Sequence, residues 1–422
     1  MKYRHRLIAA ELSSFARYFD RVLQTEMVDS DDGSVLATID APEKSMVDQL
    51  PTMNDEPRRR SVVLLNGTLN YHLDIESLLR AIKAKLSRTS RVAVVAYNPY
   101  FRWLYRFKRG DVPKTFLTRT SLENLARLTG FEIVRIRPAV YLPWFIPLLS
   151  SIINRVMPTL PLLRWLGLVN VIVLRPVIAD ERRPSLSVII PARNERGNIA
   201  AAIERLPDLG ADVEVLFVEG HSSDGTWQEI ERVAAANPKV RALKQKGRGK
   251  SDAVRLGFAE AKGELLTILD ADLTMPPEKL GSFYEAYVSG RADFVNGSRL
   301  VYPMEGAAMR FLNHLGNIFF AKTLSSVLDL RVGDSLCGTK LLARHDYQRF
   351  VRWREAFGEF DPFGDFELLF PAAVLAIGSI DVPVHYRART YGTTQIRRFR
   401  DGLHLLQMVI TAFFDIKMGR VP

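Results

Sequence analysis

An apolar run that ends in two aspartates, LLTILDADLTMPP (residues 265–277), constrains the fold of this 422-residue chain more than any other feature. A short apolar run bounded by polar residues is typical of a strand buried inside a sheet. Asp270 and Asp272 follow at its carboxyl end, where open α/β sheets bind their ligands. Two carboxylates so close together repel each other unless a cation lies near them, and oxygen ligands of this kind suit Mg²⁺ or Mn²⁺ beside a diphosphate. The sequence therefore predicts an α/β domain with a metal–diphosphate site.

Two other predicted strands in this half of the chain also end in polar residues. The segment LSVIIPARNERGNI predicts a strand over 187–190, followed by Pro191, Arg193 and Glu195. VEVLFVEG predicts a strand that is followed by Glu219, and a carboxylate at this place can bind ribose hydroxyls or a base edge. Both turns are expected on the ligand-binding edge of the same sheet.

A glycine-rich basic run, KQKGRGKSDAV, lies between these turns and the aspartate pair. Its glycines allow close backbone approach to a ligand, and its basic side chains either contact phosphates or form a solvated loop. Asp252 opens the next helix and either caps it or contacts the base.

Further candidates lie downstream of the aspartate pair. FVNGSRL contributes Arg299, GDFELLF contributes Asp365, and HYRARTYGTTQ contributes His385, Arg387 and Arg389. Asp365 is either a general base or the cap of the helix that follows it. His385 is either a metal ligand or a packed strand residue. The arginines suit bidentate contact with a diphosphate or a lipid phosphate.

Taken in this order, residues 185–395 resemble family 2 glycosyltransferases with the GT-A fold, and especially the dolichyl- or polyprenyl-phosphate mannose synthase branch. The resemblance implies an inverting, Mg²⁺- or Mn²⁺-dependent transfer from a GDP- or UDP-sugar to a lipid-phosphate or saccharide acceptor. It implies that the nucleotide-sugar is bound by Pro191, Arg193, Glu195, Glu219, Asp252, Asp270, Ala271, Arg299, Arg387 and Arg389.

The same resemblance implies roles for the remaining candidates. Asp272 and Asp365 are expected to be catalytic, and Asp270, Asp272 and His385 are expected to hold the metal. The chain departs from the branch at Thr274, where a metal-binding glutamine is usual, and at Gln395, where a lysine is usual. The change at Thr274 bears on the third metal ligand, and the change at Gln395 bears on the identity of the acceptor.

The first half of the chain resembles a different family. Strand-like and helix-like runs alternate over residues 61–178, and NGTLNYHLDIESLLRAIKAKL with SLENLARLTGFEIVRIRP is similar to the latter half of class I methyltransferases. The glycine-rich cofactor turn of that family is not visible in residues 1–60, which form a poorly specified segment. We therefore expect a degenerate domain that does not methylate, with a methyltransferase–glycosyltransferase bifunctional protein as an alternative.

Composition narrows the function without fixing it. The net charge of +11 favours anionic partners, but no nucleic-acid-binding motif is present. A single cysteine, Cys337, excludes an internal disulfide and is expected to be a buried structural thiol. No apolar run reaches the ~18 residues of a membrane span, and residues 396–422 predict a basic amphipathic helix. We expect a cytoplasmic protein, with peripheral contact on the inner membrane face as an alternative, and a nucleotidyltransferase acting on sugar phosphates as the competing activity.

Overall fold

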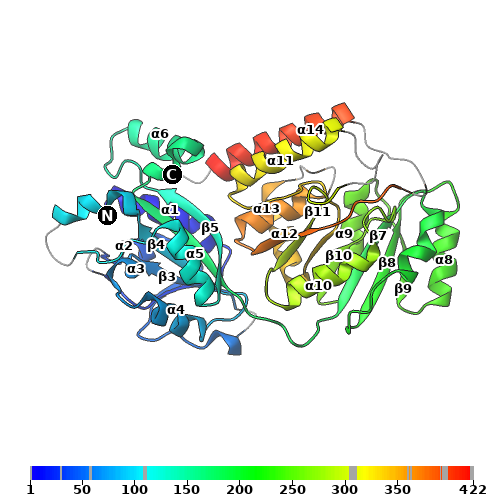
Figure 1. Cartoon of the computed structure of the whole chain (residues 1–422), viewed down its shortest axis with the longest axis horizontal. Helices are drawn as coiled ribbons and strands as arrows, with labels where there is room; N and C mark the ends of the chain where they lie inside the picture. Colours follow the sequence, from blue (N-terminus) through cyan, green and yellow to red (C-terminus); the bar gives the residue numbers. More distant parts are fainter. Residues whose placement is uncertain are drawn as a thin grey trace.

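The computed structural model contains two α/β units, each built around its own sheet (Figure 1). The residues that it describes are 2–28, 31–56, 59–107, 112–303, 311–358, 361, 364–389, 391 and 398–418. Among them, no helix is both long enough and apolar enough to cross a bilayer.

The first unit has a six-stranded sheet with the order β2-β1-β3-β4-β6-β5. Strands β1 to β4 pair in parallel, whereas β6 is antiparallel to both β4 and β5. The strands are β1 (Arg21–Gln24), β2 (Glu43–Met46), β3 (Ser61–Asn66), β4 (Arg91–Tyr97), β5 (Phe131–Ala139) and β6 (Val169–Pro176). The helices are α1 (Tyr3–Ala16), α2 (Ser34–Thr38), α3 (Thr68–Tyr71), α4 (Ile75–Lys83), α5 (Arg119–Leu128) and α6 (Leu149–Val156).

Helix α4 illustrates how the sequence specifies these elements. Asp74 caps the helix by accepting a hydrogen bond from the Ser77 amide at 3.0 Å. Ile75, Leu79 and Ile82 recur at helical spacing and are buried against the sheet. The strands and helices expected between residues 61 and 178 are all present.

Residues 1–60 are more ordered than their sequence pattern indicates. Helix α1 packs on the first sheet, and β1 and β2 extend that sheet at one edge. Both strands have four residues, and β2 is a polar, largely exposed edge strand. Strands this short have too few residues to reveal an alternating pattern.

The second unit has a seven-stranded sheet with the order β13-β11-β12-β10-β7-β8-β9. Strand β12 is antiparallel to β10 and β11, and the other pairs are parallel. The strands are β7 (Leu186–Ala192), β8 (Val213–Glu219), β9 (Val240–Lys244), β10 (Leu265–Ile268), β11 (Phe294–Ser298), β12 (Lys340–Ala343) and β13 (Ser379–Pro383). The helices are α7 (Ile199–Glu204), α8 (Thr226–Ala236), α9 (Lys250–Glu260), α10 (Leu280–Val288), α11 (Phe311–Leu328), α12 (Arg344–Phe357), α13 (Phe366–Val374) and α14 (Arg398–Thr411), which continues as a π-helical segment, Ala412–Met418.

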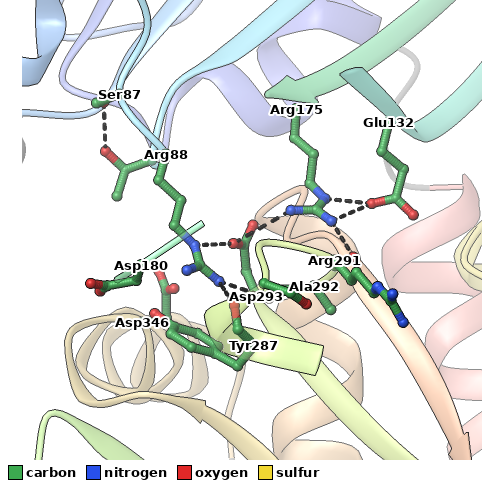
Figure 2. Close-up of polar contacts among 12 residues, drawn as sticks. Ser87, Arg88, Glu132, Arg175, Asp180, Tyr287, Arg291, Ala292, Asp293 and Asp346 are labelled. Atoms are coloured by element: carbon green, nitrogen blue, oxygen red, sulfur yellow. Dashed lines mark hydrogen bonds and ion pairs between the residues drawn. The ribbon is translucent and has the colours of Figure 1, made fainter. Parts of the chain in front are cut away.

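Buried ion pairs join the two units. Figure 2 shows Arg88 and Arg175 of the first unit pointing at Asp293, which directly precedes β11. Arg91 also contacts Asp293, at 2.9 Å. The side chains of Arg91, Arg175 and Asp293 are almost inaccessible to solvent. Solvent and salt therefore screen the ion pairs between the two units only weakly.

Candidate functional site

The expected aspartate pair lies at the carboxyl end of β10, which is flanked by β7 and β12. The ammonium of Lys250, at the start of α9, forms an ion pair with Asp270. Burial opposes ionisation of Asp270, but Lys250 outweighs that effect and lowers the pKa of this carboxyl below its usual value. Asp270 is therefore a carboxylate at neutral pH.

Asp272 contacts a different cation. Its Oδ2 accepts a hydrogen bond from Arg389 Nη2 at 2.6 Å, and Arg389 Nη1 donates to Glu195 Oε1 at 2.9 Å. Thr274 donates its amide and its hydroxyl to Asp272 Oδ1, at 3.1 and 2.8 Å. Arg389 thus links the aspartate pair to the β7 turn, and Thr274 orients Asp272.

Glu195 is buried at the turn that follows β7. Its amide donates to Thr226 Oγ1 at 2.9 Å, and its Oε2 accepts from Asn198 at 2.7 Å. Burial raises the pKa of Glu195, although the charge of Arg389 opposes this shift. The Glu195 carboxylate is held in place from two sides.

Three turns at the carboxyl ends of parallel strands contain a non-glycine residue in the left-handed backbone region. These residues are Asn194 after β7, His221 after β8 and Leu273 after β10, with φ values of 56°, 61° and 53°. Side chains with a Cβ rarely adopt this conformation, and strained residues cluster at functional sites. The three turns therefore mark one functional edge of the sheet.

The β8 turn and the glycine-rich loop lie side by side on this edge. Glu219 is buried and accepts a hydrogen bond from the Ser222 amide. Asp252 accepts from the Gly247 amide at 3.1 Å, so it closes the loop instead of only capping α9. His221 Nε2 and Gly247 O are 2.9 Å apart, which connects the two turns.

Asp365 occupies the N-cap position of α13, but its side chain is not what caps the helix. Within the described residues, its carboxylate makes no hydrogen bond to the α13 terminus, whereas Asp361 Oδ2 accepts from the Phe366 and Glu367 amides at 2.7 and 3.1 Å. Asp365 instead pairs with the ammonium of Lys340 at 2.6 Å, and both side chains are buried. Asp365 also contributes to the electrostatic environment of Lys250, so it belongs to the same cluster as Asp270.

The other candidates occupy distinct positions. Arg299 forms a buried bidentate pair with Asp334, at 2.6 and 2.9 Å. His385 is exposed and stacks on Tyr302, with ring centroids 4.1 Å apart. Arg387 is exposed and donates its amide to Thr274 O at 2.9 Å.

Three more of the expected residues sit on or beside the strand ends. Pro191 is part of β7, Arg193 is exposed just beyond it, and Ala271 is buried between the two aspartates. In the described part of the chain, no group of three His, Cys, Asp or Glu side chains is close enough to hold a metal ion, so Asp270, Asp272 and His385 are not gathered as one set. Gln395 lies outside the described residues.

Several residues of this cluster were not predicted from sequence. Lys340 and Asp361 carry no local signal, because a lysine in a strand and an aspartate in a loop are common surface features. Gly338 differs from these two residues, because the sequence does show it as a glycine just before a strand, in VGDSLCGTKLL. A Cβ at Gly338 would overlap the charged ends of Lys250 and Asp270, so a larger residue there must displace these two side chains.

Cys337 matches its expected role. It is buried, and burial raises the pKa of its thiol to about 12. A thiol in this state is protonated at neutral pH and is a poor nucleophile.

Comparison with known proteins agrees with this geometry. Residues 187–350 match the family model described as Glycosyl transferase family 2. A dolichyl-phosphate hexose transferase of Haloferax volcanii is 30% identical over 239 residues, which cover 55% of this chain and 96% of that relative. A dolichol-phosphate mannosyltransferase of Pyrococcus furiosus is 36% identical over 118 residues, 28% of this chain and 33% of the relative.

The match therefore covers about a third of the length of the Pyrococcus relative, compared with nearly all of the Haloferax relative. Among solved structures, the mannosyltransferase PcManGT from Pyrobaculum calidifontis, in complex with GDP-Man and Mn²⁺, covers 57% of this chain and 66% of its own, with 18% identity and a TM-score of 0.37. The family model and the near-complete coverage of the Haloferax relative lead to one conclusion: this chain belongs to glycosyl transferase family 2.

Proposed function

We propose that the chain is an inverting, metal-dependent hexosyltransferase that moves a sugar from a GDP- or UDP-sugar to a polyprenyl phosphate. The observation that carries this proposal is the aspartate pair at the end of β10. Each aspartate is neutralised by its own cation, Lys250 or Arg389, within a site whose other turns supply Glu195 and Glu219. The carboxylate oxygens of the aspartate pair are the ligands that a divalent cation prefers, and such a cation would in turn bind a diphosphate.

The donor set fits Mg²⁺ or Mn²⁺. Asp270 and Asp272 offer carboxylate oxygens, but among the described residues His385 is not gathered with them, so diphosphate oxygens and water would complete the shell. Thr274 positions Asp272, because its hydroxyl donates a hydrogen bond to that carboxylate. When bound, the metal would stabilise negative charge on the departing diphosphate. Arg387, Arg193 and the basic side chains of the glycine-rich loop would bind the phosphates, and Glu219 and Asp252 would contact the nucleoside.

A polyprenyl phosphate is the favoured acceptor because its attacking oxygen is already anionic. The Haloferax and Pyrococcus relatives are both named for dolichyl-phosphate acceptors. Asp365 is paired with Lys340, and it would serve as general base only for a hydroxyl acceptor. Whether Asp365 acts as a general base therefore depends on which acceptor the enzyme uses.

Two adjacent helices support peripheral contact with a membrane that carries such an acceptor. Helices α11 and α14 lie side by side on the second unit (Figure 1). Their exposed apolar side chains recur at helical spacing and are Leu315, Phe319, Leu403, Leu406 and Ile410. A stripe of this kind suits the boundary between head groups and acyl chains.

We further propose that the first unit does not methylate. Its parallel strands and antiparallel final pair are consistent with a methyltransferase-like origin. However, Gly33 is the only glycine before Gly67, so the loop after β1 cannot form a glycine-rich cofactor turn. A direct titration with S-adenosylmethionine should therefore show no binding.

The proposed activity is tested with purified protein, nucleotide-sugars and a polyprenyl phosphate. We expect Mn²⁺ together with a GDP- or UDP-sugar to raise the melting temperature. We also expect Asp272→Asn to lower transfer at least ~100-fold, because it removes a charged ligand from the metal–diphosphate site. Asp212→Asn, on an exposed residue of the same unit, is the matched control and should be fully active. Release of pyrophosphate from a nucleoside triphosphate and a sugar phosphate would instead identify a nucleotidyltransferase.

A further inference from the structure

The chain between β5 and β6, residues 140–168, forms an excursion that covers a pocket. The pocket lies between this excursion, α1, β5 and the C-terminal π-helical segment. None of its lining residues belongs to the site around Asp270. The side chains that matter most are Glu11, Arg137, Arg155, Arg164, Asp329 and Lys417.

This pocket carries more positive than negative charge. Asp329 accepts contacts from Arg137 at 2.8 Å, from Arg164 at 2.7 Å and from Lys417 at 2.7 Å. Glu11 pairs with Arg137 at 3.1 Å. The lining therefore contains two acidic side chains and four basic ones, which are Arg137, Arg155, Arg164 and Lys417.

One buried donor of the pocket lacks an acceptor. The Arg137 side chain is only 5% exposed, and its Nη2 has no hydrogen-bond partner in the described structure. Two nitrogens of the neighbouring Arg135 are also without partners there. A buried donor left unpaired destabilises the protein, so these guanidinium groups favour an anion with several acceptor oxygens.

The excursion combines a buried polar anchor with many exposed apolar side chains. Asn154 lines the pocket and holds the loop: its Oδ1 accepts from Tyr141 N at 2.7 Å, and its Nδ2 donates to Leu142 O at 3.0 Å. Leu148 and Leu162 are 81% and 83% exposed. The other exposed apolar residues of the excursion are Trp144, Phe145, Ile146, Leu149, Ile152, Val156, Leu160 and Trp165.

We propose that residues 140–168 dock on the surface of a bilayer and that the pocket beneath them binds the phosphate of an anionic phospholipid head group. An apolar outer face beside a cationic pocket matches a lipid, which presents acyl chains and a phosphate together. Aromatic residues such as Trp144 and Trp165 favour the same interface. In Figure 1, α6 lies along the same edge of the molecule as α11 and α14, so one flat membrane can meet both surfaces.

This inference is independent of sugar transfer, because it concerns bulk phospholipid and not the acceptor. Flotation of the full chain with vesicles of phosphatidylcholine, or of phosphatidylcholine mixed with phosphatidylglycerol, tests it. We expect binding to the mixed vesicles to be at least ~10-fold stronger and to weaken as salt is raised. Thermal shift with nucleotide-sugar, measured separately, shows whether the proposed transferase site is intact.

Two variants and a matched control make the test specific. Substituting Leu148, Leu162 and Trp165 together by serine should weaken vesicle binding at least ~10-fold and leave only the contact proposed for α11 and α14. Leu73→Ser with Leu128→Ser, at residues 80% and 60% exposed elsewhere on the first unit, should leave binding unchanged. Arg164→Gln should remove the preference for phosphatidylglycerol. The proposal is overturned if the wild type does not bind vesicles, if both serine variants behave alike, or if Arg164→Gln keeps the full preference.

Discussion

At the scale of single residues, charge neutralisation organises the site. Asp270 and Asp272 would repel each other, yet Lys250 contacts one and Arg389 the other. These cations come from segments on either side of the aspartates in the chain. The aspartate pair could be predicted from sequence because it lies in one local pattern. Arg389 and the basic loop were also expected at the site, but their pairing with the two aspartates could not be predicted, because only the folded sheet brings α9 and the segment after β13 to the same edge.

Gly338 makes this arrangement testable. In Gly338→Ala the new methyl group displaces the charged ends of Lys250 and Asp270, which are flexible and can move at little cost in stability. We expect an unchanged melting temperature and a fall in kcat/KM of ~10- to 100-fold, since a displacement of ~1 Å at a reacting centre has effects of this size. Gly316→Ala, in α11 where a Cβ meets open space, is the control. Full activity of Gly338→Ala would contradict the role assigned to Lys250 and Asp270.

At the scale of elements, long elements were predictable, whereas very short strands and the capping of one helix were not. Helix α4 shows helical periodicity and β4 is a seven-residue, mostly apolar run, whereas β1 and β2 have four residues each. The start of α13 is a second example. Both Asp361 and Asp365 precede this helix, and the sequence left Asp365 open as either its cap or a general base. In the structure the Asp361 carboxylate accepts hydrogen bonds from the first amides of α13, and Asp365 pairs with Lys340.

The C-terminal π-helical segment provides a pH prediction. Burial lowers the pKa of Lys417 to about 8, although Asp329 opposes this shift. The unfolded chain, with a lysine pKa of ~10.4, then binds more protons than the folded chain between these values, so this group makes the protein more stable as pH rises through that range. We expect the melting temperature of the wild type, relative to Lys417→Met, to increase from pH 7.5 to pH 10 (roughly the interval between the two pKa values). If the difference in melting temperature between the wild type and Lys417→Met is the same at every pH, the pKa of Lys417 is not lowered in the folded protein.

At the scale of the whole molecule, buried ion pairs hold the first unit against the second, so the two are joined by more than the linker between them. Arg88 and Arg175 point at Asp293 (Figure 2), and Arg91 also pairs with it. Arg60 reaches Asp346 at 3.3 Å. Burial opposes ionisation of Asp293, but the three arginines, led by Arg175, lower its pKa far below the usual range. No sequence pattern predicts these contacts, because Arg88 and Asp293 are 205 residues apart, Arg60 and Asp346 are 286 residues apart, and neither pair shares a motif.

We therefore expect Asp293→Asn to uncouple the two units. The substitution leaves three buried guanidinium groups facing a neutral amide, and breaking a buried pair in this way costs ~3–5 kcal/mol. The wild-type units should unfold in urea in one transition, followed by tryptophan fluorescence in two forms of the chain that keep only Trp165, in the first unit, or only Trp353, in the second. Asp293→Asn should show separate transitions, whereas Asp212→Asn, on an exposed residue, should unfold like the wild type. Coincident transitions at unchanged midpoint in Asp293→Asn would mean that apolar contacts, and not these ion pairs, couple the units.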